Sequence, residues 1–378
     1  MSRGRKARSV GRQGNENSFW WLVLILCAVG IWFWWSSHNS TEEPNAPLTV
    51  QTPMTNAPAQ PAPKPILPLA ATPLPTVVKT STPSPAPFPS GDYPRPPRDI
   101  LEAQIALSQF GISPGSIDGA IGSQTRAALA AFQNKSGVPA TGELDMATRA
   151  TLALMSAPLT TYIVNINDLS RLQPVSKTWL GKSQQTALDF ENILELLAER
   201  GHASPNLIRR LNPTVNWSNV VVGTEVSMPK ADYPKAPTKA AFLIINLAKK
   251  HLEAFDAETN LLAHFPCSIA ARFDKRPVGE LHVTTVATAP DYTFNPEVFP
   301  ESEEARNLGG KLILPPGPNN PVGSAWVGLD KPGYGIHGTP NPEQVGRTES
   351  HGCFRLANWN ADYLAKLVWV GLPVRVVP

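Results

Sequence analysis

Cysteine is scarce in this chain, with only Cys27, Cys267 and Cys353 among 378 residues. No Cys-x-x-Cys or His-x-x-x-His spacing occurs. This lack argues against a zinc site, because zinc ligands usually include such closely spaced pairs. Outside one C-terminal motif the histidines are scattered along the chain, at His38, His202, His251, His264 and His282. The sequence therefore predicts no metal site, and it implies no organic cofactor.

The chain also lacks a strong excess of charge, since its net charge is +3. Residues 1–18 contain five basic residues and one acid, a net charge of +4, which leaves −1 for everything that follows. A basic surface that binds nucleic acid is therefore not expected.

Residues 19–35, FWWLVLILCAVGIWFWW, contain no charged side chain. This stretch is long enough to span a bilayer core, and its terminal tryptophans suit the two interfaces. The basic tail at 1–18 predicts a cytoplasmic N-terminus. We therefore expect a single-pass anchor in the cell (inner) membrane, with Cys27 in the lipid and the rest in the periplasm or wall space. A cleaved signal peptide is the alternative, but Ser36-Ser37-His38 offers no Ala-x-Ala site.

Residues 36–97 are predicted to form a linker. Seventeen of the 40 prolines lie between positions 41 and 97, among many Ala, Thr and Ser residues. Proline-rich chain favours extended polyproline II, so this segment can reach roughly 170 Å from a membrane. The many Pro-x-x-Pro matches follow from proline density alone.

The first packed domain is predicted at residues 98–156, with three helices. Asp99 followed by Glu102 is an N-cap pattern, Ser123 starts a second helix, and Asp145 precedes a short third one. The segment SIDGAIGSQTRAALAAFQNKSGVPATGELDMATRATL resembles the three-helix peptidoglycan-binding domain, through its Asp-Gly-x-x-Gly-x-x-Thr and Phe-Gln signatures. The resemblance implies wall binding. The glycines and apolar residues of this segment, taken by themselves, are explained by the needs of folding and indicate no ligand.

Residues 160–232 are predicted to form a small α+β module. One amphipathic helix follows Phe190, and Ser204-Pro205 begins a second. Residues 220–222 and 225–228 are predicted to pair as a hairpin around Gly223-Thr224. The stretch from 193 to 229 resembles a LysM module, a fold that grips N-acetylglucosamine chains, although a domain that only packs is also consistent with it.

The remaining residues, 240–378, are predicted to be mainly β. Four stretches are rich in branched and aromatic residues and are separated by short turns. These stretches are 241–247, 251–256, 261–269 and 280–288, and a helix is expected from Asn358 to Val368. Cys267 lies within one of the strands, and we interpret it as a buried small hydrophobe.

Residues 336–356 bring a cysteine and two histidines close together in sequence. A thiol is a weak nucleophile until a base or a positive environment lowers its pKa. His351 lies two residues before Cys353, where it is badly placed to orient the thiol, whereas His337 can approach from a neighbouring strand as general base. Gly352 allows a sharp turn that would direct the amides of 351–353 at one point, as an oxyanion hole requires. A zinc site at Cys353 is the alternative, but no fourth ligand is evident.

The segment NPVGSAWVGLDKPGYGIHGTPNPEQVGRTESHGCFRL resembles the active-site region of the L,D-transpeptidase (YkuD-like) family, cysteine enzymes that remodel peptidoglycan. The stretch Arg276-Pro277-Val278-Gly279-Glu280 resembles the family's Thr-Pro-x-Gly-x-Phe, with arginine at 276 and leucine at 281 as departures. The resemblance implies a β-sandwich that carries Cys353 and His337 on one sheet face. It also implies site roles: Cys353 as nucleophile, His337 as base, the Gly338 carbonyl orienting that base, the amides of His351, Gly352 and Cys353 as oxyanion hole, and Ser350 and Arg355 supporting the pocket.

This resemblance implies a two-step acyl transfer on peptidoglycan stem peptides, with release of D-Ala followed by attack of an amine on the acyl-enzyme. A neighbouring stem would give a cross-link, water would make the protein an L,D-carboxypeptidase, and a lysine of an envelope protein would be attached to the wall. The glycine- and proline-rich segment 308–323 is a candidate lid. A wall-binding scaffold with an inactive cysteine site is the alternative from another functional class.

Overall fold

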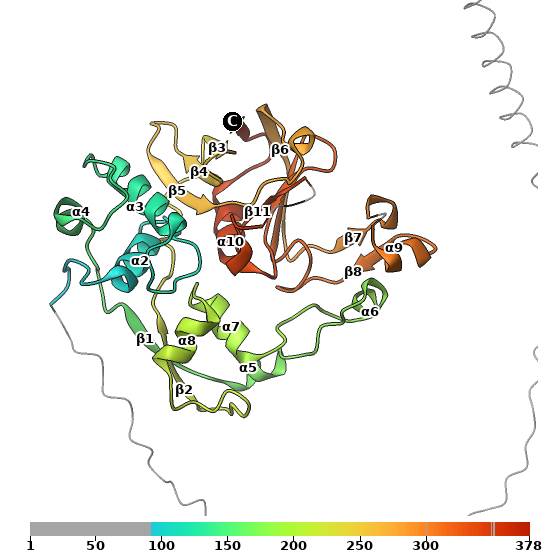
Figure 1. The fold of residues 1–378 in the computed structure, drawn as a ribbon, viewed down its shortest axis with the longest axis horizontal. Helices are drawn as coiled ribbons and strands as arrows, with labels where there is room; N and C mark the ends of the chain where they lie inside the picture. The colour runs from blue at the N-terminus through green and yellow to red at the C-terminus, as the bar shows by residue number, and fades with distance from the viewer. Residues whose placement is uncertain (1–91, 300, 349, 351) are drawn as a thin grey trace, which may run out of the picture. The chain divides into compact units, whose positions relative to one another are not determined.

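Figure 1 shows a computed structural model of the chain, which describes residues 92–299, 301–348, 350 and 352–378. The predicted basic tail and membrane anchor, and nearly all of the predicted linker, lie outside these ranges. Within them, no helix has both the length and the apolar character that a membrane crossing needs.

Three helices follow the linker, as predicted. They are α2 (Ile100–Gln109), α3 (Ser123–Lys135) and α4 (Met146–Thr151). The Asp99 side chain accepts a hydrogen bond from the backbone N–H of Glu102, and Asp145 caps α4 in the same way through Thr148. These caps satisfy backbone donors that a helix leaves without an intrahelical partner.

A fully buried glutamine explains the Phe-Gln signature of this helical domain. The Gln133 amide nitrogen donates to the Glu143 carbonyl at 2.9 Å and to the Thr148 hydroxyl at 2.6 Å. Its amide oxygen accepts from the Gly142 N–H at 2.8 Å. Gln133 therefore ties α3 to the turn that precedes α4.

The second module contains a two-stranded antiparallel sheet with helices between its strands. Two of these helices confirm the predictions: α7 (Ile193–Arg200), and α8 (Pro205–Leu211), which Ser204 caps. The module's elements in order are β1 (Leu159–Ile163), α5 (Ile166–Ser170), α6 (Trp179–Ser183), α7, α8 and β2 (Glu225–Pro229).

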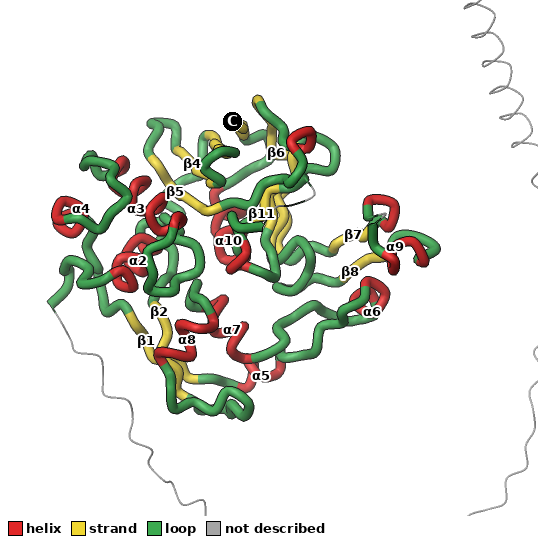
Figure 2. Tube along the Cα trace, viewed as in Figure 1, coloured by secondary structure: helices red, strands yellow, loops and turns green. Residues whose placement is uncertain are grey.

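The predicted hairpin in this module is wrong. Residues 220–222 form no strand, and β2 pairs instead with β1, with Leu159 opposite Pro229. Figure 2 draws the stretch between α8 and β2 as loop. Val226 of β2 is buried, whereas Val221 and Val222 are exposed. The two exposed valines therefore do not cover the buried face of β2. That partner lies more than 60 residues upstream, beyond the reach of a local pattern.

The C-terminal domain is built on an eight-stranded sheet in the order β11-β10-β9-β6-β12-β3-β4-β5. The four predicted strand stretches appear as β3 to β6, and the predicted C-terminal helix is α10 (Asn358–Leu367). The strands are β3 (Phe242–Asn246), β4 (His251–Phe255), β5 (Leu261–Pro266), β6 (Gly279–Thr288), β9 (Ala325–Leu329), β10 (Gly335–His337), β11 (Phe354–Arg355) and β12 (Pro373–Val377).

The two ends of this sheet meet each other. Ser268, just beyond β5, exchanges two backbone hydrogen bonds with Arg355 of β11, at 2.9 and 3.0 Å. The sheet therefore curls round a buried core, to which α10 contributes Leu364 and Leu367. The free side of β5 pairs with the helical domain, where the His264 N–H donates to the Gly111 carbonyl and the Ser113 N–H donates to the His264 carbonyl.

A separate hairpin projects from the C-terminal domain toward the second module. It consists of β7 (Tyr292–Phe294) and β8 (Leu312–Leu314), with α9 (Glu303–Asn307) between them. Three short 3-10 turns complete the chain at Phe273–Lys275, Pro296–Val298 and Pro342–Gln344. Figure 1 shows α6 of the second module beside β8, and Leu188 shares a small apolar core with Phe294 and Leu314.

Replacing Gln133 with alanine should lower the free energy of unfolding by about 3 kcal/mol, because several buried groups lose their partner at once. Chemical denaturation followed by circular dichroism checks this. Asn134→Ala, at an exposed position of the same helix, is the control and should change stability by less than about 0.5 kcal/mol. Equal effects of the two substitutions would contradict the role of Gln133.

Candidate active site

His337 ends β10 and is buried, with 6% of its surface exposed. Its Nδ1 lies 2.6 Å from the Gly338 carbonyl oxygen, so Nδ1 carries the proton and Nε2 is left free to accept one. The ring stacks against Trp326 of β9 at a centroid distance of 5.6 Å. Burial lowers the pKa of His337 to about 4, so the imidazole is neutral at neutral pH.

Cys353 immediately precedes β11, which runs parallel to β10 with Ile336 opposite Phe354. Continuing this register places Cys353 opposite Gly335, on the face of the sheet that also carries His337. The buried Ile336 and Phe354 lie on the other face, in the core. The sheet therefore brings the two predicted reactive side chains to the same face from separate strands.

The Cys353 thiol is partly covered, and its Sγ donates to the Gly333 carbonyl at 3.5 Å. Burial raises the pKa of Cys353, while the Gly335 backbone and the Arg355 guanidinium act to lower it. The structure thus holds a neutral thiol, hydrogen-bonded to the Gly333 carbonyl, on the sheet face that also carries a neutral imidazole, and Arg355 supplies positive potential to both. Such a pair needs proton transfer to the base before the sulfur can attack.

Ser350 shapes the turn before the cysteine. Its hydroxyl donates to the Cys353 carbonyl at 2.5 Å and accepts from the Gly352 N–H at 3.3 Å. Its backbone is fixed to the strand extension after β5, through the Ile269 carbonyl and the Ala271 N–H. His351, the first of the predicted oxyanion donors, lies outside the described residues.

Arg276 contacts the segment that pairs with this turn, although the sequence analysis treated position 276 only as a departure from the family pattern. Its guanidinium donates to the carbonyls of Ala270 and Ala271, at 2.7 and 3.1 Å. Because the Ala271 N–H donates in turn to the Ser350 carbonyl, Arg276 stabilises the backbone that positions the cysteine turn.

Trp326 is a site residue that the sequence analysis did not single out. A Cβ added at Gly335 would lie 2.5 Å from its indole ring, so the tryptophan lies directly over the glycine opposite Cys353. Trp326 also pairs with His337 across the strands. The available signal in the sequence was an aromatic residue two positions after Ser324. Because side chains alternate along β9, that residue lies on the same sheet face as His337.

Asn358, at the start of α10, fixes the loop that carries Gly338. It is fully buried, and its side-chain oxygen accepts from the Ser324 N–H at 3.2 Å. Its side-chain nitrogen donates to Glu199 of the second module at 3.0 Å and to the Pro318 carbonyl at 3.1 Å. A Cβ at Gly338 would lie 2.3 Å from the Asn358 side-chain oxygen. Gly338 is therefore tightly enclosed, and with it the carbonyl that orients His337.

The candidate lid segment 308–323 is an ordered part of this site. It contains β8 and the Pro318 carbonyl that Asn358 binds. Its partner strand β7 carries Tyr292, whose pKa is raised by burial and by the nearby Cys353. Burial and the nearby Cys353 raise the pKa of Tyr334 as well.

Cys267 is fully buried, as predicted, and its thiol donates to the Ser268 carbonyl. Cys267 and Cys353 are both free thiols. Within the described ranges, which omit His351, one group of three side chains is close enough to hold a metal ion, and it does not include Cys353. The alternative of a zinc site at Cys353 therefore gains no support.

The comparison with known sequences identifies the C-terminal domain. Residues 240–376 match the sequence model of YkuD, the L,D-transpeptidase catalytic domain. A Bacillus licheniformis protein, "Putative L,D-transpeptidase YkuD", is 25% identical over 186 residues, which cover 49% of this chain and 93% of that protein. A Fuscovulum blasticum protein, "Putative L,D-transpeptidase in ATP synthase subunits region ORF 5", is 30% identical over 135 residues, covering 36% of this chain and 68% of that protein.

The chain belongs to the L,D-transpeptidase family. Residues 97–152 of this L,D-transpeptidase match a second sequence model, "Putative peptidoglycan binding domain", which agrees with the predicted helical domain. Among solved structures, an L,D-transpeptidase from Mycobacterium smegmatis is 18% identical, with a TM-score of 0.29. That match covers 42% of this chain and 65% of the other, just under two thirds of its length.

The raised pKa of Cys353 predicts how its alkylation depends on pH. Iodoacetamide reacts with the thiolate, so the rate should be low at neutral pH and should still be rising above pH 9.0, the ordinary pKa of a cysteine. Arg355→Gln should move the curve to still higher pH, because a positive charge that favours the thiolate is removed. Peptide mapping by mass spectrometry separates Cys353 from the other cysteines, and a plateau near neutral pH would contradict this description.

Proposed function

We propose that this L,D-transpeptidase uses Cys353 to transfer acyl groups between peptidoglycan stem peptides. The observation that carries the proposal is the His337 imidazole, whose Nδ1 is engaged by the Gly338 carbonyl at 2.6 Å on the sheet face that also receives Cys353. This arrangement leaves a single ring nitrogen free to accept a proton. It is the geometry expected of a general base that serves a thiol nucleophile.

In the first step, the free His337 Nε2 accepts the Cys353 proton while the sulfur attacks the carbonyl carbon of the L-centre that precedes D-Ala. The tetrahedral intermediate collapses when its C–N bond breaks, and His337 returns the proton to the departing amine of D-Ala. A thioester on Cys353 remains. In the second step, an incoming amine attacks the thioester and gives its proton to His337, and the thiol is regenerated when the proton returns to sulfur.

The negative oxygen of each tetrahedral intermediate needs hydrogen-bond donors. We assign these to the backbone amides of residues 351–353, and the Gly352 N–H would exchange its 3.3 Å hydrogen bond to the Ser350 hydroxyl for one to this oxygen. Arg355 adds positive potential at the same point. Its charge favours the thiolate and disfavours a protonated His337. It therefore assists attack by the sulfur more than it assists protonation of the base.

The acceptor in the second step determines the product. A neighbouring stem gives a direct cross-link, which is the reaction we favour, and a lysine of an envelope protein gives a protein attached to the wall. Attack by water would make the protein an L,D-carboxypeptidase. The scaffold alternative predicts wall binding without any release of D-Ala.

The modules before the catalytic domain would hold the enzyme on its substrate. The helical domain would bind peptidoglycan, and the second module, in which four helices lie between the paired strands β1 and β2, would act as a LysM-like contact with glycan strands. The apolar stretch at 19–35 would anchor the chain in the inner membrane, with its catalytic domain in the periplasm or wall space. The proline-rich linker would supply the reach to the wall.

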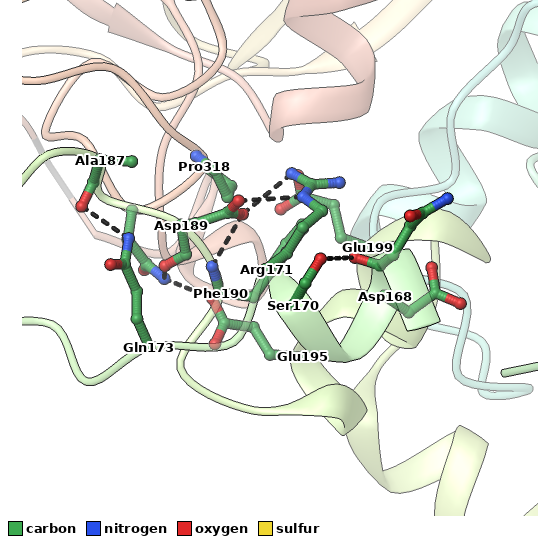
Figure 3. Close-up of polar contacts among 12 residues, drawn as sticks. Asp168, Ser170, Arg171, Gln173, Ala187, Asp189, Phe190, Glu195, Glu199 and Pro318 are labelled. Atoms are coloured by element: carbon green, nitrogen blue, oxygen red, sulfur yellow. Dashed lines mark hydrogen bonds and ion pairs between the residues drawn. The ribbon is translucent and has the colours of Figure 1, made fainter. Parts of the chain in front are cut away.

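The β7–β8 hairpin would act as the lid over the donor stem, and the second module would set its position. Trp179 of α6 stacks on Phe294 of β7 at a centroid distance of 4.1 Å. The Leu188 N–H donates to the Pro316 carbonyl at 2.9 Å. Figure 3 shows the same strip of the module, where Asp189 and Phe190 lie beside Pro318 of the lid segment. The second module thereby contacts the lid directly.

Replacing Cys353 with alanine should abolish both the thioester adduct and the release of D-Ala from a disaccharide tetrapeptide. Intact-mass measurement and D-Ala quantification detect the two events. Cys267→Ala is the matched control and should retain activity, because its thiol is buried in the core. His337→Gln should lower turnover by about 10²- to 10⁴-fold. D-Ala release by the Cys353 variant would refute the mechanism, and no release by the wild type would favour the scaffold.

Replacing Trp179 with alanine should raise KM for the donor tetrapeptide by about tenfold, because the lid hairpin loses its stacking partner. A tenfold change corresponds to about 1.4 kcal/mol of donor binding free energy. Steady-state kinetics of D-Ala release measure this change. Leu180→Ala, on the same short helix but with an exposed side chain, is the control and should leave KM unchanged. If both variants behave as wild type, the module does not position the lid.

A further inference from the structure

Two histidines that are scattered in the sequence meet in the structure, at a distance from Cys353 along the sheet. His251 and Glu253 lie on the same face of β4, and Glu253 is directly opposite His264 of β5. One ligand atom from each of these three side chains lies within 4.8 Å of the other two. The cluster was hidden from the sequence because hairpin pairing, and not close spacing, assembles it.

The cluster is covered by protein. The exposed fraction is 1% for the His264 side chain, 12% for His251 and 20% for Glu253. Two of the ring nitrogens, Nδ1 of His251 and Nε2 of His264, are buried and have no hydrogen-bond partner. The other nitrogen of each ring, Nε2 of His251 and Nδ1 of His264, faces Glu253, and these are the nitrogens available to a shared ion.

The distances are close to those of a metal site. His264 Nδ1 lies 3.1 Å from Glu253 Oε1, and His251 Nε2 lies 3.8 Å from Glu253 Oε2. A tetrahedral zinc ion at about 2.0–2.1 Å from each ligand holds ligand atoms roughly 3.4 Å apart. Small side-chain rotations would therefore bring the three atoms onto one ion. Two imidazole nitrogens and one carboxylate oxygen form a donor set that divalent transition metals prefer.

A cavity of about 140 Å³ lies beside the two imidazoles and offers room for a fourth ligand. Lys249, Lys250 and Arg347 line it, together with Gln124 of α3. These positive charges oppose a bound cation, so an ion held here would require an anionic fourth ligand, such as hydroxide or a small carboxylate. Three protein ligands and one open position match the pattern of zinc sites that are not closed by protein alone.

We propose that His251, Glu253 and His264 bind a divalent transition metal ion, with zinc as the best fit, at the junction of the catalytic and helical domains. The backbone of His264 is the point where β5 pairs with Gly111 and Ser113. An ion bound to the His264 ring would fix β4 and β5 together under that contact. The metal would therefore stabilise the docking of the wall-binding domain on the catalytic domain.

The test uses the full-length chain without a histidine tag, carrying Cys27→Ser and Cys353→Ala so that neither thiol competes for the ion. After EDTA treatment and gel filtration, zinc sulfate is titrated by calorimetry, and cobalt is added to follow its visible absorption. One ion per chain should bind, and zinc should raise Tm. Glu253→Gln and His251→Gln should each weaken binding by more than about 100-fold.

His282→Gln is the matched control. His282 lies on the same sheet between two carboxylates, 3.1 Å from Asp330 and 3.7 Å from Glu280, but its side chain is 46% exposed. This variant should bind zinc as the parent does. Because Glu253→Gln preserves shape, it decides the question even if His251→Gln fails to fold. No saturable binding, or equal binding by the parent and the Glu253 variant, would overturn the site.

Discussion

The buried side chain of Asn358 is the contact through which three parts of the chain meet. It binds Glu199 from the second module, the Pro318 carbonyl from the lid segment and the Ser324 N–H from the start of β9. Glu199 and Pro318 are both labelled in Figure 3. Burial raises the pKa of Glu199 to about 8, so this contact is made largely by a neutral carboxylic acid at neutral pH. A neutral partner spares the interface the cost of burying a charge.

The reactive pair depends on the same contact through the enclosed Gly338. Its carbonyl accepts a hydrogen bond from the His337 Nδ1–H, and the glycine lies so close to Asn358 and Gly323 that no larger residue would fit at this position. The imidazole is further held by Trp326 on one face. Orientation of the base is therefore supplied by backbone and packing. No carboxylate among the described contacts of the His337 side chain takes the orienting role that an aspartate has in the serine triad.

Local features of this fold were predictable from sequence because their causes are local. Asp99, Asp145 and Ser204 are helix caps whose partners lie three residues away, and richness in branched and aromatic residues predicted the strands β3 to β6. The roles of Cys353, His337 and Gly338 are implied by the motif, and the structure places Cys353 just before β11, with His337 and Gly338 at the end of β10, which pairs with β11.

What the sequence could not reveal depends on distant pairing. The partner of β2 is β1, which lies far upstream and has mostly exposed side chains. The contacts of Arg276 were missed because its two carbonyl partners, Ala270 and Ala271, lie outside the motif. His251 and His264 looked scattered because the β4–β5 hairpin is what joins them. The pattern His-x-Glu on one strand, with a histidine on the next, was the available signal.

The pairing of β5 with Gly111 and Ser113 affects whether the catalytic domain can be separated from the helical domain. An uncovered outer strand presents backbone donors and acceptors that can recruit a strand from another molecule. Here the His264 backbone is satisfied by the helical domain, and the Leu261 carbonyl accepts from Lys135 of α3 at 2.7 Å. The peptidoglycan-binding domain thus protects the catalytic sheet from self-association, and a catalytic domain separated from it would lose solubility as well as a wall contact.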